Sequence, residues 1–228
     1  RDLGAVEVTA FLNHLAQQRQ VAAATQNQAL AALLFLYKEV LGEPLPWLDQ
    51  LVHAKSPIRR PTVLTATEAR ALLAQLRGPK WLMASLLYGA GLRLRECLTL
   101  RVKDVDFGYR QILVRDGKGG KDRVTILPTP VIEPLQAHLI RVKALHERDL
   151  AEGYGDVELP DALARKYPRA PYEWGWKFVF PSYKRSVDPR TGVIRRQHVY
   201  ENYLLRGVKD AARAAGITKH VSCHTLRH

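Results

Sequence analysis

Residues 91–126 read GLRLRECLTLRVKDVDFGYRQILVRDGKGGKDRVTI, and this stretch decides the fold class. A short helix is predicted to begin at about Arg93, just after two glycines, and to end near Leu100. Two β-type runs follow, residues 112–114 and 124–126, and they flank a polar, glycine-rich stretch. This pattern predicts an antiparallel hairpin with a flexible basic tip. The expected fold is therefore mainly α with a small antiparallel β-sheet (α+β).

Helical patterns lie on both sides of that stretch. Thr65 and Glu68 form a capping box that predicts a helix start, and the apolar residues that follow Trp81 predict a buried helix ending at Gly89 or Gly91. Downstream, helices are expected over 131–150, over 197–215 before Gly216, and from about His224, with a short strand at Phe178-Val179-Phe180. Residues 64–228 are therefore predicted to form one mixed domain.

The N-terminal residues predict a separate helical unit. Apolar positions at helical spacing indicate a helix over 5–20. Thr25 with Gln28 forms a further capping-box pattern, which predicts the start of a helix that ends at Gly42. We expect residues 1–42 to be a small all-α domain that lacks its own beginning.

Residues 43–63 join the two parts and contain four prolines. Proline removes an amide donor and fixes φ, so this stretch is predicted to be an extended linker. The linker holds the pair Arg59-Arg60, which either contacts phosphate or is a solvated charge pair.

Composition and charge limit the function. The 228 residues carry 35 Lys and Arg against 22 Asp and Glu, a net charge of +13, and residues 61–228 carry +12 of it. Nucleic acid is the expected partner of such a surface. The sequence has no apolar run of membrane-spanning length and too few cysteines, two, for a disulfide framework. We expect a soluble, cytoplasmic protein that is not associated with a membrane.

Three places in the sequence could carry chemistry, and the first two have a plainer alternative. Arg93 at a helix start suits phosphate binding, although such arginines are commonly solvated. Lys118 at the hairpin tip could reach a phosphate or donate a proton, or could be an ordinary turn lysine. His224 and Arg227 share a helix face and could hold one anion together.

Metal and thiol chemistry are less well supported at the C-terminal end. His224 and His228 have helical spacing, but the Glu of a His-Glu-x-x-His motif is absent. Cys223 and Cys97 are both expected to be buried core residues rather than nucleophiles. No metal or cofactor is predicted.

Taken together, Gly-Leu-Arg-x-x-Glu, a hairpin lysine and His-x-x-Arg resemble the tyrosine recombinase (phage integrase) family. The resemblance implies a helical, SAM-like core-binding domain, a linker and a catalytic domain. It also implies that Arg93, Lys118, His224 and Arg227 are catalytic, with Glu96 supporting Arg93. Lys121 and the Arg59-Arg60 pair would then contact DNA.

The family's mechanism passes through a tyrosine that holds the DNA as a 3′-phosphotyrosyl ester. The resemblance places that tyrosine, after a further His or Trp, well beyond the His-x-x-Arg box, whereas all nine tyrosines of this sequence precede the box. We therefore interpret residues 64–228 as a C-terminally truncated catalytic domain. The chain by itself is expected to be inactive, without a nucleophile.

An extra segment at about 152–177 resembles the insertion that marks integron integrases within this family. That resemblance implies recombination of gene cassettes, with a duplex attachment site and folded single-stranded cassette sites as DNA partners and a homotetramer on DNA. Trp176, Pro189 and His198 lie where this subgroup is expected to hold extrahelical bases. The alternative for Trp176 is that it anchors the insertion as part of the core.

Two other functions agree with the charge. A recombinase remnant would bind DNA without chemistry, and a coding sequence that continues to a His or Trp and then a Tyr would exclude it. An unrelated basic repressor would leave Arg93, Lys118, His224 and Arg227 with no shared purpose.

Overall fold

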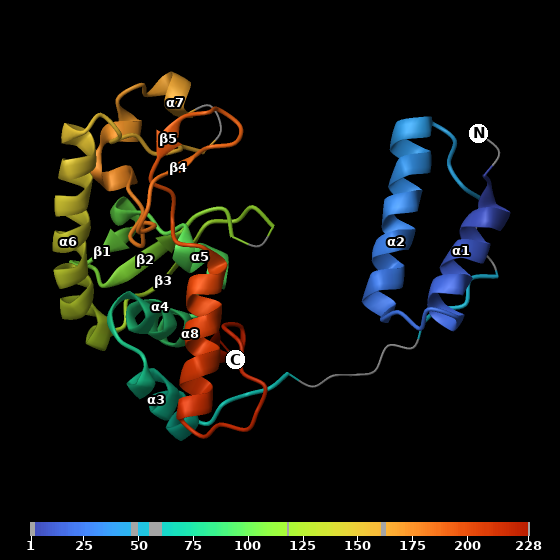
Figure 1. Cartoon of the computed structure of the whole chain (residues 1–228), viewed down its shortest axis with the longest axis horizontal. Helices are drawn as coiled ribbons and strands as arrows, with labels where there is room; N and C mark the ends of the chain where they lie inside the picture. The colour runs from blue at the N-terminus through green and yellow to red at the C-terminus, as the bar shows by residue number, and fades with distance from the viewer. Residues whose placement is uncertain (1–2, 47–49, 55–60, 118, 161–162, 228) are drawn as a thin grey trace. The chain divides into compact units, whose positions relative to one another are not determined.

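The computed structural model describes residues 3–46, 50–54, 61–117, 119–160 and 163–227. The chain divides into two compact units, residues 1–60 and residues 61–228 (Figure 1). The described residues are mainly helical with two small antiparallel sheets, which confirms the predicted α+β class. No described helix is long and apolar enough to cross a membrane.

The first unit is a pair of helices, α1 (Ala5–Gln17) and α2 (Ala23–Phe35). A π-helical turn, Leu36–Leu41, continues α2 and ends at Gly42, whose φ of +71° favours glycine. The capping-box prediction at Thr25 was wrong. Helix α2 begins earlier because the carbonyl of Ala22 already accepts the amide of Thr25 at 2.8 Å.

A buried glutamine fastens the residues after the helices to this unit. The side chain of Gln26 donates to the carbonyls of Leu12 at 3.0 Å and Val52 at 2.7 Å, and accepts the amide of Ala54 at 2.8 Å. Asn13 adds a bond from the Val52 amide at 2.7 Å. This part of the predicted linker is therefore bonded to the first unit.

The second unit holds the predicted hairpin and its surrounding helices. Its helices are α3 (Ala66–Gln75), α4 (Gly78–Gly89), α5 (Leu94–Leu98), α6 (Ile132–Ala151), α7 (Leu163–Lys166) and α8 (Glu201–Ala214). Its strands are β1 (Val105–Asp106), β2 (Gln111–Val114), β3 (Arg123–Ile126), β4 (Ser186–Val187) and β5 (Ile194–Arg195). The capping box at Thr65 is confirmed, with both of its hydrogen bonds present.

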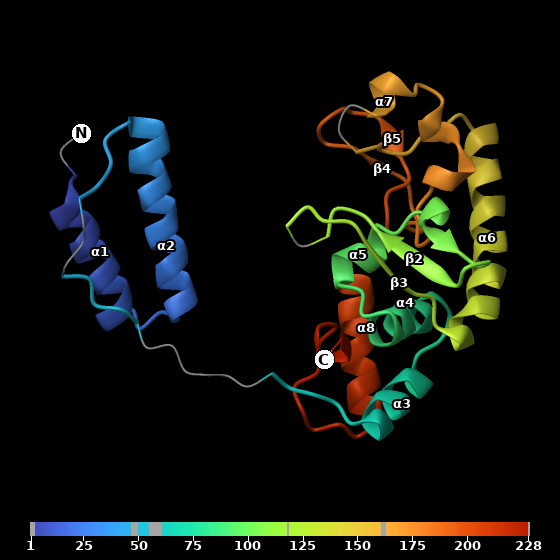
Figure 2. The ribbon, with the colours of Figure 1, turned by 180° about the vertical axis from the view of Figure 1, so that it is seen from behind.

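Helix α4 forms the centre of this unit because residues 82–87 are all buried. It contacts α3, α5, α6, α8 and the last turn of the chain, Thr225–Arg227. The three-stranded sheet, in the order β1-β2-β3, lies between α5 and α6 (Figures 1 and 2). In both views the loop end of the β2–β3 hairpin extends beyond α5, on the side away from α6.

Three predicted elements differ from the structure. Phe178–Phe180 is no strand: Phe178 forms an isolated bridge with Arg101, and no ladder continues there because the partner segment becomes a 3-10 helix at Val102–Asp104. Helix α8 begins at Glu201 rather than near residue 197, since the preceding backbone pairs with Phe180 and Pro181. The described residues after His224 form one 3-10 turn, not a longer helix.

Candidate phosphate-binding and nucleic-acid site

Arg93 stands at the entrance to α5, as its N-cap residue. Gly91 has a φ of +63°, a conformation that glycine adopts without strain, and Leu92 is buried in the core. The backbone is therefore anchored on the core side while the Arg93 side chain remains 34% exposed. An arginine fixed in this way beside helix-start amides can bind a phosphate.

Glu96 orients Arg93 from within the same helix turn. Its Oε2 accepts the Arg93 amide and its Oε1 accepts Nη1 of the Arg93 guanidinium, both at 2.7 Å. Glu96 thus contacts both the backbone and the side chain of Arg93, and the i, i+3 spacing of this pair follows from the sequence.

Arg123, the first residue of β3, contacts the same carboxylate and was missed by sequence reasoning. Its Nη1 donates to Oε1 of Glu96 at 2.8 Å, and its Nη2 donates to Oε2 at 2.7 Å. The only sequence signal was an arginine just after the glycine-rich tip. Local periodicity does not connect that position with Glu96, 27 residues away.

The two arginines keep Glu96 ionised. Burial alone would raise the pKa of this carboxyl, but hydrogen bonds from Arg123 and Arg93 outweigh burial and lower the pKa to about 2. In turn, the hydrogen bond to Glu96 raises the pKa of Arg123. The group is a carboxylate shared by two guanidiniums, with about a third of each arginine side chain exposed.

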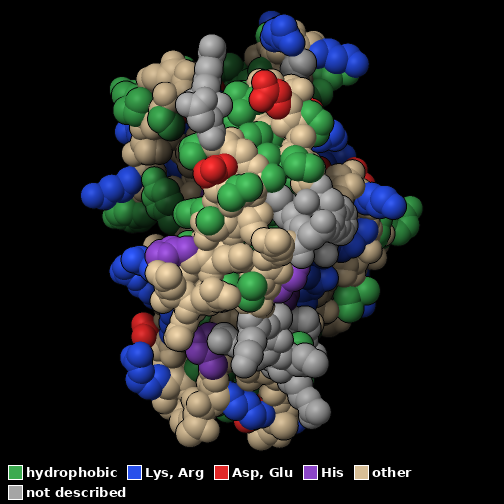
Figure 3. Space-filling model, turned by 90° about the vertical axis from the view of Figure 1, so that its right-hand side faces the viewer, with side chains coloured by type: hydrophobic (Ala, Val, Ile, Leu, Met, Phe, Trp, Pro, Cys, Tyr) green, Lys and Arg blue, Asp and Glu red, His purple; other side chains and the backbone are tan. Residues whose placement is uncertain are grey.

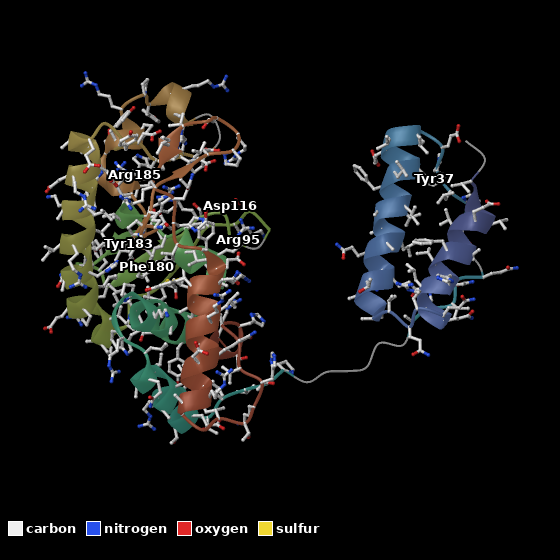
Figure 4. All side chains as sticks on the ribbon, in the orientation of Figure 1. Tyr37, Arg95, Asp116, Phe180, Tyr183 and Arg185 are labelled. Atoms are coloured by element: carbon white, nitrogen blue, oxygen red, sulfur yellow. The ribbon has the colours of Figure 1, made fainter. Side chains whose placement is uncertain are left out.

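The hairpin end closes beside this group. A Cβ on Gly117 would lie 2.8 Å from the carbonyl oxygen of Lys121 and 3.2 Å from Nη1 of Arg123, so a glycine fits where a larger residue would collide. Figure 4 shows Asp116 at the same end of the unit as Arg95 of α5. Lys118 lies outside the described residues, as does the pair Arg59-Arg60. Lys121 is exposed.

His224 and Arg227 bracket the last turn of the chain. The amide of Arg227 donates to the carbonyl of His224 at 3.1 Å, which places the two residues one 3-10 turn apart. His224 is exposed and Arg227 is half-buried, while Thr225 and Leu226 between them are buried. The turn packs against α4, the helix that leads to Arg93.

The two cysteines, Cys97 in α5 and Cys223 just before the last turn, belong to the same buried core. Both are buried, as predicted. Burial raises the pKa of the Cys97 thiol, the Cys223 thiol raises it further, and burial also raises the pKa of Cys223 to about 11. Each cysteine of this core is adjacent in sequence to a candidate residue, Glu96 or His224.

Trp176 and His198 belong to one aromatic cluster. The Arg101 guanidinium lies 3.7 Å from the centre of the Phe178 ring and donates to the Trp176 carbonyl at 2.8 Å. His198 meets Phe178 edge to face, with 5.3 Å between ring centres. The Lys103 ammonium lies 2.9 Å from the centre of the Trp176 ring, so this cation occupies one ring face.

Pro189 lies elsewhere, exposed in the β4–β5 loop beside the buried carboxylate of Asp188. Trp176 also packs against the small core of the insertion. Trp176 and His198 are therefore linked indirectly, through Arg101 and Phe178, and Pro189 lies on a separate loop.

A cleft of about 450 Å³ extends from Glu96 to Trp176. Glu96 of α5, the hairpin residues Asp116 and Asp122, and Trp176 of the insertion all line it. A larger groove, about 980 Å³, lies between α6 and residues 180–185 and contains none of the predicted site residues. Of the predicted site residues, Glu96 and Trp176 line the smaller cleft.

A buried lysine fixes the insertion. Nζ of Lys177 donates to the carbonyls of Gly155 and of Pro171, the latter at 2.6 Å. Burial lowers the pKa of Lys177 to about 8. Arg196 beside β5 also forms a paired contact with Asp149 of α6, at 2.5 and 2.8 Å. The insertion and the β4–β5 hairpin therefore lie together at the C-terminal end of α6 (Figures 1 and 2).

The charged surface agrees with a polyanionic partner. Figure 3 shows Lys and Arg side chains exposed at several places on the drawn face, and Asp and Glu at few. Within the described part of the chain, no group of three or more His, Cys, Asp or Glu side chains is arranged to hold a metal ion.

Comparisons with known proteins give a consistent match. The profile of the phage integrase family matches residues 62–228, and that of the phage integrase N-terminal SAM-like domain matches residues 1–47. An integrase/recombinase of Escherichia coli is 49% identical over 226 residues, which cover 99% of this chain and 67% of the relative. The tyrosine recombinase XerD of Mycobacterium leprae is 32% identical over 91% of the chain and 60% of its own length.

Solved structures match at the level of the fold. The XerH recombinase bound to a palindromic difH substrate has a TM-score of 0.61 and 21% identity, over 99% of this chain and 60% of that one. A lambda integrase dimer bound to a COC′ core site has a TM-score of 0.58 and 16% identity, over 99% and 69%. The chain spans about 60 to 67% of the length of the curated relatives described above.

Proposed function

Because the chain belongs to the phage integrase family, the tyrosine recombinases, we propose that it forms the DNA-holding part of a site-specific recombinase, which cleaves and rejoins DNA strands. The observation that carries this proposal is the half-exposed Arg93 guanidinium, oriented by Glu96 at a helix start. Attack on a phosphodiester adds negative charge to its non-bridging oxygens. A fixed guanidinium stabilises that charge more in the transition state than in the ground state.

The other candidates take the remaining steps. Arg227 binds the same phosphate, and His224 assists positioning and proton transfer. A tyrosine hydroxyl forms the new P–O bond while the bond to the 5′ oxygen breaks, and Lys118 gives that oxygen its proton. The ester conserves the bond energy, so rejoining needs neither ATP nor a metal.

The nucleophile is proposed to lie outside this sequence. All nine tyrosines precede His224, whereas the family's nucleophile follows that box. We expect this chain alone to bind DNA partially and to leave it uncut, with four copies of the full-length gene product acting on two DNA sites.

The finer proposal is that the substrates are integron sites, a duplex attachment site and folded single-stranded cassette sites. Extrahelical bases expose ring faces that aromatic side chains can grip. Trp176, which lines the cleft, supports this proposal. Lys103 covers one face of the Trp176 ring, so a base that stacks on that face must displace the ammonium.

Cleavage of a nicked suicide substrate by the full-length gene product tests the reaction. We expect covalent protein–DNA product from the wild type and none from Arg93→Ala, with DNA affinity within about threefold because one phosphate contact is only part of the total. Undiminished cleavage by Arg93→Ala would sink the site assignment. DNA binding by the wild type with no covalent product would favour the non-catalytic remnant.

Recombination of hairpin and duplex sites tests the substrate. Trp176→Ala should reduce recombination of folded cassette sites at least tenfold and of duplex sites by less than threefold, since stacking is worth about 1–3 kcal/mol per base. Tyr183→Ala is the matched control because Tyr183 is 92% exposed and is not part of the cluster. Equal losses on both substrates would indicate a folding role for Trp176.

A further inference from the structure

We propose that Arg123 is a positioning residue for strand cleavage: it holds Glu96 from the hairpin strand, and Glu96 in turn aims Arg93 at the phosphate. This inference rests on the proposed function, but it concerns a residue that neither the motifs nor the comparisons point to. Under this proposal, the β2–β3 hairpin and α5 act together to position Arg93.

The carboxylate of Glu96 is shared equally between the two arginines. Each oxygen of Glu96 accepts one hydrogen bond from Arg93 and one from Arg123, at 2.7 to 2.8 Å. The contact with Arg123 is bidentate, the geometry that fixes a planar carboxylate most firmly. Arg93 gives Glu96 only one guanidinium nitrogen, so its other nitrogens can serve a phosphate.

Without Arg123 the balance changes. Two lone-pair sites of Glu96 become vacant, and the Arg93 guanidinium, which already contacts this carboxylate, can fill them. A second bond from Arg93 to Glu96 would turn the guanidinium toward the carboxylate and away from a phosphate. With Arg123 in place, the carboxylate of Glu96 accepts only one bond from the Arg93 guanidinium. The remaining guanidinium nitrogens of Arg93 then stay directed toward a phosphate.

A second contact shows that this face of β3 is built to hold the α5 region. Thr125 lies two residues after Arg123, so the two side chains point to the same face of the strand. Its Oγ1 donates to the carbonyl of Ala90 at 2.8 Å, just before Gly91. Arg123 and Thr125 therefore tie β3 to both ends of the 90–96 segment that carries Arg93.

The other end of the hairpin is packed on the same group. The Gly117 backbone is close enough to Arg123 that an added Cβ would be 3.2 Å from its Nη1 and 3.8 Å from Oε1 of Glu96. The amide of Gly117 donates to the carbonyl of Lys121 at 3.1 Å. The ends of the hairpin loop thus rest on the ion group rather than standing apart from it.

Single-turnover cleavage by the full-length gene product, measured together with DNA affinity, tests the proposal. Arg123→Gln should slow cleavage about 100-fold, the loss expected from a misplacement of about 1 Å. DNA affinity should change less than threefold, because Arg123 binds Glu96 and not phosphate. Arg123→Lys restores a cation without the bidentate geometry and should recover part of the rate.

A matched control separates positioning from general weakening of the hairpin. Arg115 lies on the same hairpin, and its Nε donates to the buried carboxylate of Asp104 at 2.7 Å without contacting Glu96. Arg115→Gln should cleave at a rate within about threefold of wild type. Equal slowing by Arg115→Gln and Arg123→Gln would overturn the proposal.

A second readout does not depend on activity and uses the present chain. Carboxyl NMR should find Glu96 ionised down to about pH 2 in the wild type and titrating at higher pH in Arg123→Gln. Asp116 and Asp122 line the same cleft and serve as internal references, since the hydrogen bonds described for the Arg123 guanidinium go to Glu96. An unchanged Glu96 titration would overturn the proposal even if the rate fell.

The outcomes distinguish this inference from the proposed function. If the wild type forms no covalent product, the proposed function fails, and the NMR titration still decides whether Arg123 fixes Glu96. If the wild type cleaves and Arg123→Gln cleaves equally fast, the function stands and the inference fails.

Discussion

Two buried ionised groups in the second unit are stabilised in opposite ways. Glu96 lies between two guanidiniums, and its pKa falls to about 2. Lys177 is equally buried, but its described hydrogen-bond partners are two neutral carbonyls, and its pKa falls to about 8. The pKa of an acid and the pKa of a base are both lowered, which means that the charge is favoured at Glu96 and disfavoured at Lys177.

This difference in charge stabilisation matches two roles: Glu96 orients a functional arginine, whereas Lys177 holds the insertion in place. At Glu96 the charged form is the stable one, so the arginine beside it keeps a fixed orientation over a wide pH range. At Lys177 the charge is a cost of holding the insertion to α6, and any gain comes from the two carbonyl contacts and the packed stem.

The largest effect is expected at Glu96 in acid. Its folded-state pKa is below the ordinary 4.5, so its contribution is complete above pH 4.5 and is lost as pH falls toward 2. Glu96→Gln should be less stable than wild type by about 3 kcal/mol at pH 6 and similar to it near pH 2. Urea unfolding at several pH values measures this, and a pH-independent difference would break the comparison.

Lys177 should show the opposite pH dependence. The unfolded lysine holds its proton up to about pH 10.5, while the folded one releases it near pH 8, so stability rises across that range. Relative to Lys177→Met, the wild type should gain about 2 kcal/mol between pH 8 and 10. The titration of Cys223 is common to both chains and cancels. A flat difference would show that burial does not lower the pKa of Lys177.

A neutral contact on the same face of β3 should matter less than either charge. Thr125→Val removes the hydrogen bond to the Ala90 carbonyl and should cost about 1 kcal/mol. Thr99→Val is the matched control, because the Thr99 hydroxyl only bonds a carbonyl of its own helix and is exposed. Thermal unfolding compares the two, and equal losses would contradict a special role for the β3 face.

The smallest effect is expected at the Trp176 ring. Lys103→Ala removes a partly exposed cation–π contact and should cost no more than about 1 kcal/mol. It should also make Trp176 more accessible to acrylamide, with Lys103→Ala/Trp176→Phe as the background. Lys166→Ala, which removes a similar contact with exposed Tyr167, should leave the tryptophan signal unchanged. Unchanged quenching in Lys103→Ala would mean that Lys103 does not shield the ring.

The elements predicted best are those with strong local signals. The hairpin over 111–126 and the capping box at Thr65 depend on residues close in sequence, and both are present. The box at Thr25 failed because Thr25 and Gln28 match the same pattern inside a helix that starts earlier. Phe178–Phe180 was apolar enough for a strand, but the segment opposite it continues from Arg101 into a 3-10 helix, so Phe178 forms only an isolated bridge.

The site was predictable only where its contacts are local. Glu96 and Arg93 are three residues apart, so their pairing follows from helix spacing. Arg123 reaches Glu96 across the hairpin, and no periodicity carries that information. Lys103 on Trp176 is likewise a tertiary contact, over a separation that sequence patterns do not span.

The shared carboxylate affects how Glu96 and Arg123 can change during evolution. Replacing Arg123 alone leaves Glu96 half-paired, and replacing Glu96 alone leaves two guanidiniums facing each other. Each single step therefore passes through a less fit intermediate, while a joint exchange does not. Across relatives we expect Glu96 and Arg123 to be inherited as a pair, so that drift at one position is recorded at the other.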